Sequence, residues 1–100
     1  MSQLVGWVEQ RSAVAPPALR ARALEYVRQN PAGSAPDALA RAAGQALAEV
    51  EQHPGDRSAA LDLLAADALI TLSLLAQAEQ EPAGLAQFAS SLLDEALPAA

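Results

Sequence analysis

The stretch that most constrains this chain runs from residue 57 to residue 80, where no proline or glycine interrupts 24 residues. Eight leucine and isoleucine side chains are distributed around the whole circumference of the helix that it predicts. A helix that is apolar on all sides is usually buried on all sides. It would be about 36 Å long, whereas a compact domain of this size has a radius of about 13 Å. We therefore expect a long central helix that other helices or a second copy of the chain cover.

The composition favours helices throughout. Alanine and leucine, the two best apolar helix formers, account for 26 and 16 of the 100 residues. Strand formers are scarce, with three aromatic residues, five valines, one isoleucine and one threonine. The sequence therefore predicts an all-α fold, a single small bundle of four to five helices in which residues 1–100 form one domain.

Prolines and capping residues mark the expected helix ends. Pro16 and Pro17 begin the second helix, and Asn30 before a proline ends it. Ser34 resembles the first residue of a capping box, and Asp56 is a typical N-cap. The expected helices span about residues 2–13, 17–29, 34–52, 57–80 and 83–97.

Two polar residues of the central helix are predicted to lie within an apolar face. Asp67 and Thr71 are four residues apart, flanked by alanine and leucine, and we expect both to be buried. An arginine from an earlier helix would pair with Asp67. The best candidates are Arg20 and Arg28, which could instead meet Asp62 or the acids near residues 79–81. A functional carboxylate is the alternative role. The expected solvent-facing side carries Ser58, Asp62, Ser73, Gln77 and Gln80.

Residues that could carry chemistry are few. The single histidine, His53, precedes a proline at a helix end, where a cationic side chain interacts with the last carbonyl groups. No second histidine and no cysteine are present, and no serine lies in a nucleophile motif. We therefore expect no catalytic residue, no metal site, no cofactor and no enzyme activity.

Charge limits the partners. The formal net charge is −6, which disfavours nucleic acid and anionic membrane surfaces. Residues 59–76 approach the length of a membrane span but contain two aspartates, each costing about 2.5–3.5 kcal/mol at a bilayer centre. The N-terminal sequence has no basic region, and Glu9 interrupts its apolar run, so we expect no secretory signal, no membrane span and a cytoplasmic protein.

These patterns predict a non-catalytic helical interaction module that binds itself, as a homodimer or small oligomer, or another protein. The candidate interface residues are Leu64, Leu72 and Leu75 of the central helix, with Trp7 near the N-terminus. One alternative is a small ligand-binding or enzymatic bundle with a cavity near Asp67, Thr71 and Tyr26. The other is an accessory or adaptor subunit of a larger assembly that uses the segment around Trp7.

Overall fold

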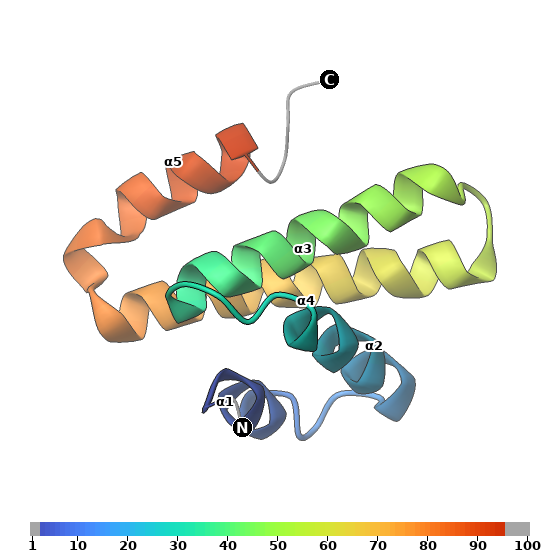
Figure 1. The fold of residues 1–100 in the computed structure, drawn as a ribbon, viewed down its shortest axis with the longest axis horizontal. Helices are drawn as coiled ribbons and strands as arrows, with labels where there is room; N and C mark the ends of the chain where they lie inside the picture. Colours follow the sequence, from blue (N-terminus) through green and yellow to red (C-terminus); the bar gives the residue numbers. More distant parts are fainter. Residues whose placement is uncertain (1–2, 96–100) are drawn as a thin grey trace.

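The computed structural model describes residues 3–95 as a set of helices joined by short turns (Figure 1). Within that range there is no strand, so the all-α prediction is confirmed. The helices are α1 (Gln3–Arg11), α2 (Pro17–Arg28), α3 (Ala35–Gln52), α4 (Arg57–Gln80), the 3₁₀ turn η1 (Pro82–Gly84) and α5 (Leu85–Glu95).

The helix ends follow the predicted signals. Ser34 is the N-cap of α3, and its side chain accepts a hydrogen bond from the amide of Asp37 at 3.4 Å. Asp56 caps α4 in the same way through the amide of Ser58, at 3.2 Å. Gly55 before it has a φ of +81°, a conformation that favours glycine. The first helix ends at Arg11 rather than at residue 13, and residues 2 and 96–97 of the predicted terminal helices lie outside the described range.

The centre of the fold is the antiparallel hairpin of α3 and α4, which lie side by side in Figure 1 and share the most extensive contact of any two elements. Small side chains dominate its buried surface, so the two backbones can approach closely and the buried leucines are few. On α3 these residues are Ala38, Leu39, Ala42, Ala43 and Ala46. On α4 they are Ala59, Asp62, Ala65, Ala66, Leu69, Ser73 and Ala76.

The remaining helices cover this hairpin unequally. Helix α2 packs against α4 and α3, and α1 packs on α2, where Val8, Leu24 and Val27 join the core. Figure 1 shows α5 on the opposite side of the hairpin from α1 and α2. Leu92 of α5 is buried. The radius of gyration, 12.9 Å, agrees with a compact domain of this length.

The expectation that α4 is buried on all sides is wrong for a single copy of the chain. Helix α4 is long and apolar enough to cross a membrane by length and composition, yet less than half of its apolar window is buried. Its buried side packs against α3 and α2, and several of its leucines remain exposed on the other side. One continuous face of α4 is therefore left uncovered by the other helices in a single copy of the chain.

Candidate functional site

The exposed residues of α4 include leucines, and of the residues expected to face solvent Ser58 and Gln80 are exposed whereas Asp62 and Ser73 are buried. Leu64 is 55% exposed and Leu75 is 38% exposed, and Leu63 beside them is 52% exposed. Since successive residues of a helix are rotated by about 100°, the outward residues from Arg57 to Ala78 fall within an arc of about 80°. We call this set the outer face of α4: Arg57, Ala60, Leu64, Asp67, Thr71, Leu75 and Ala78.

The predicted burial of Asp67 and Thr71 is wrong, because both residues lie exposed on this outer face. The hydroxyl of Thr71 donates to the backbone carbonyl of Asp67 at 3.0 Å, so its hydrogen-bonding capacity is met within the helix. The physical reason is the packing of α4 on α3. The two helices can approach closely only where α4 presents its alanine-rich side to α3. Asp67 and Thr71 lie on the other side of α4, so they face solvent together with Leu64 and Leu75.

The buried acid of α4 is Asp62, which was predicted to be exposed and is 4% exposed. Its Oδ1 accepts a hydrogen bond from the hydroxyl of Tyr26 at 2.8 Å. The same oxygen accepts an Nη1–H of Arg22, forming an ion pair between α2 and α4. Ser73, also predicted to be exposed, is fully buried and donates to the carbonyl of Ile70 at 2.7 Å. Asp62 and Ser73 therefore belong to the core contact.

The pairing of Asp62 with Arg20 or Arg28 is likewise wrong. Arg20 lies on another side of α2, where its guanidinium donates to the carbonyl of Glu9 at 3.1 Å. Arg22 and Tyr26 are one helical turn apart and share the side that faces α4. That spacing was available in the sequence and could have indicated the pair, because an arginine and a tyrosine at i and i+4 can converge on one carboxylate.

Protonation within this network follows from burial and hydrogen bonding. Burial, then the hydrogen bond to Asp62 and the negative charge of that carboxylate, raise the pKa of Tyr26 to about 12. The hydrogen bond to Asp62 also raises the pKa of Arg22 above its ordinary value. The arrangement is therefore an Arg22–Asp62 ion pair supported by a phenol that stays neutral at neutral pH.

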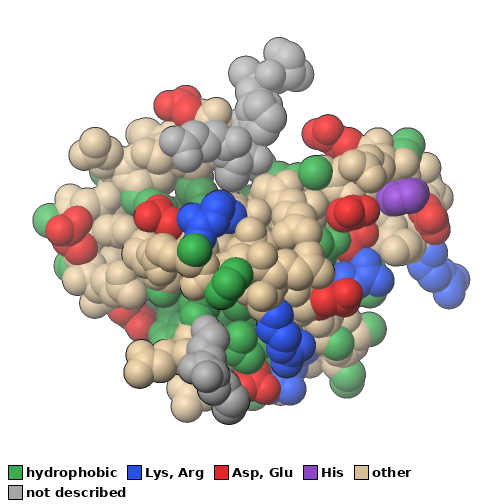
Figure 2. Space-filling view, viewed as in Figure 1, with side chains coloured by type: hydrophobic (Ala, Val, Ile, Leu, Met, Phe, Trp, Pro, Cys, Tyr) green, Lys and Arg blue, Asp and Glu red, His purple; other side chains and the backbone are tan. Residues whose placement is uncertain are grey.

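A polar cavity of about 280 Å³ opens beside this network. His53 and Glu49 stand at its rim, with 3.8 Å between Nε2 and Oε2. His53 is the C-cap residue of α3 through its backbone amide, which donates to the carbonyls of Glu49 and Val50, whereas the expected contact was between its side chain and the last carbonyl groups. Figure 2 shows the histidine (purple) beside acidic side chains at one end of the molecule. Among residues 3–95, no group of acids and histidine is placed to hold a metal ion. Asp67 and Thr71 lie on the outer face of α4 and do not line this cavity, so the structure does not bring them together with Tyr26.

The other two candidate interface residues are less exposed. Leu72 is half-buried and packs against the core. The indole Nε1 of Trp7 donates to Glu79 at 3.3 Å, and Arg11 both forms a 3.0 Å ion pair with Glu79 and lies 4.9 Å from the centre of the indole ring. The hydrogen bond from Arg11 lowers the pKa of Glu79 below its ordinary value. Trp7 is therefore engaged in attaching α1 to α4.

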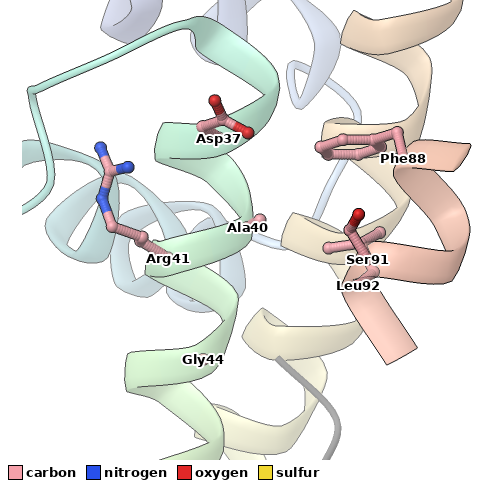
Figure 3. A pocket seen from close by; sticks show the side chains of 7 residues that line it. All are labelled: Asp37, Ala40, Arg41, Gly44, Phe88, Ser91 and Leu92. Carbon is pink, nitrogen blue, oxygen red and sulfur yellow. The ribbon is translucent and has the colours of Figure 1, made fainter. Parts of the chain in front are cut away.

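A groove of about 500 Å³ between α3 and α5 was not anticipated from the sequence. Figure 3 shows Phe88, Ser91 and Leu92 of α5 facing α3 across it. Asp37 lies on the opposite wall, and Arg41 points toward the loop before α3, where it donates to the carbonyl of Ala32. The groove is open and mixed in polarity, with no polar side chain buried in it, so the outer face of α4 is the stronger candidate site.

Comparison with protein-family models, with curated proteins and with solved structures finds no match to this chain.

Proposed function

We propose that this protein is a non-catalytic helical interaction module that self-associates through the outer face of α4 to form a homodimer. The observation that carries the proposal is the exposure of Leu64 and Leu75 on the outer face, with Leu63 exposed beside it, on the helix that is otherwise the centre of the fold. Single exposed leucines are ordinary, whereas several on one continuous helix face are typical of an interface. Burial of such a face contributes about 25 cal/mol per Å² of apolar surface.

Charge supports a protein partner over other classes. The net charge of −6 repels phosphate backbones and anionic lipid headgroups. The basic and acidic residues are also unevenly divided, with five arginines and three acids in residues 1–41 and one arginine and nine acids in the remainder. A cytoplasmic location fits this proposal and is part of it. The competing proposal is an adaptor subunit that contacts a dedicated partner protein through the segment around Trp7.

The test compares the solution mass of the wild-type protein with that of Leu64→Arg by light scattering at tens of micromolar. Leu93→Arg is the matched control, because Leu93 is 62% exposed on α5, outside the outer face of α4. We expect twice the chain mass of 10.3 kDa for the wild type and the control, and 10.3 kDa for Leu64→Arg. A wild type that remains monomeric, or a Leu64→Arg variant that remains dimeric, would overturn the proposal. In the first case the outer face would be left to a different partner.

A further inference from the structure

We infer that the two copies pair their α4 helices antiparallel about a twofold axis near residue 69, so that Leu64 packs on the partner's Leu75. This inference rests on the proposed self-association and adds the orientation and register of the pair. A twofold interface is self-complementary: if residue i contacts residue j of the partner, residue j contacts residue i of the partner. The residues that α4 turns outward satisfy this condition.

The outward residues are arranged symmetrically about the middle of α4. Leu64 and Leu75 lie at equal distances on either side of the point between residues 69 and 70. Ala60 and Ala78 lie nine residues before and after residue 69. In an antiparallel pair each leucine therefore meets a leucine and each alanine meets an alanine. Small residues at these positions allow close approach of the two helices.

Opposite charges flank the outer face at matching distances, because Arg57 is the first residue of α4 and Glu81 is its C-cap, just beyond the face. Arg57 and Glu81 lie twelve residues before and after residue 69, and both are exposed. In the part of the chain that the structure describes, neither takes part in an ion pair. Antiparallel pairing places Arg57 beside the partner's Glu81, twice per dimer. Parallel pairing would instead place like charges together at both ends.

The residues in the middle of the outer face also favour antiparallel pairing of the two α4 helices. In a parallel, in-register pair, Asp67 would lie opposite the partner's Asp67, and opposed like charges are unfavourable. In the antiparallel pair Asp67 lies opposite the partner's Thr71, and the two aspartates are about 7 Å apart along the helix axis. Antiparallel helices also align their dipoles favourably.

Disulfide mapping tests the register, since the sequence contains no cysteine. In the antiparallel pair, residue 64 is about 16 Å along the axis from residue 64 of the partner, beyond the Cα–Cα distance of about 7 Å that a disulfide can bridge. Leu64→Cys alone and Leu75→Cys alone should therefore remain uncrosslinked on mild oxidation. An equimolar mixture of the two variants should form a crosslinked heterodimer. Leu93→Cys is the control and should crosslink to neither.

The outcomes separate the register from self-association, because light scattering before oxidation reports whether each variant still dimerises. Dimers in which Leu64→Cys crosslinks to itself, or in which the mixture does not crosslink, would overturn the antiparallel register and leave the proposed function standing. Monomers in every sample, the wild type included, would overturn both. As a second readout, Arg57→Glu should weaken the dimer about fivefold, and adding Glu81→Arg in the same chain should restore it. Failure of that restoration would contradict the Arg57–Glu81 pairing.

Discussion

The hydroxyl of Tyr26 donates a 2.8 Å hydrogen bond to Oδ1 of Asp62, joining α2 to the buried side of α4. Arg22 binds the same carboxylate oxygen from the preceding turn of α2. A buried charge is tolerated where it is paired and hydrogen-bonded. This contact therefore defines which side of α4 faces the core, and it places the leucines of the outer face in solvent.

Replacing Asp62 should be far more damaging than replacing Asp67, the other aspartate of α4. Asp62→Ala leaves Arg22 and the Tyr26 hydroxyl without their acceptor, and we expect a loss of about 2–3 kcal/mol in the free energy of unfolding. Asp67→Ala should change it by about 0.5 kcal/mol or less, because Asp67 is exposed. Urea unfolding at neutral pH measures both variants in the Leu64→Arg background, which removes the contribution of self-association. Equal losses would contradict the assigned faces of α4.

Tyr26 should ionise only in strongly alkaline solution. Its pKa is raised to about 12, mainly by burial and then by the hydrogen bond to Asp62, against about 10 in an unfolded chain. Because the folded pKa is the higher one, the stability from this group is present below pH about 10 and is lost as the pH rises toward 12. Tyr26 is the single tyrosine, so tyrosinate absorbance reports it directly. Ionisation near pH 10 while circular dichroism still shows folded helices would contradict the buried position.

The Trp7–Glu79 contact should respond to acid. The hydrogen bond from Arg11 lowers the pKa of Glu79. The stability that the ionised Glu79 contributes is therefore present above the unfolded pKa of about 4.3, and it is lost as the pH falls through the lower folded pKa. Trp7 is the single tryptophan, and its fluorescence should change in that range. Glu79→Gln should abolish the change, whereas Glu81→Gln should leave it intact. An unchanged transition in Glu79→Gln would show that α1 is held by other contacts.

The helices and their ends could be predicted because local residues determine them. The side chains of Ser34 and Asp56 accept hydrogen bonds from backbone amides in the first turns of α3 and α4. Pro17 lies in the first turn of α2, where its missing amide hydrogen costs no hydrogen bond. These preferences act within a few residues and depend little on the rest of the fold. The alanine-rich composition then leaves helices as the only regular structure that the chain forms within residues 3–95.

The orientation of α4 about its own axis could not be predicted in the same way. Its apolar residues surround it, so no periodic pattern distinguishes the buried side. Close packing against α3 favours Ala65, Ala66 and Ser73 over the larger leucines, and Arg22 provides the partner that lets Asp62 be buried. Both determinants are tertiary. The expectation that leucines mark the core side therefore exchanged the roles of Asp62 and Asp67.

Sedimentation equilibrium of the unmodified protein over a range of micromolar concentrations tests the central claim most directly, that the outer face of α4 joins two copies of the chain. The account predicts a monomer–dimer equilibrium with a limiting mass of twice 10.3 kDa. A mass that stays at 10.3 kDa at every concentration would contradict it.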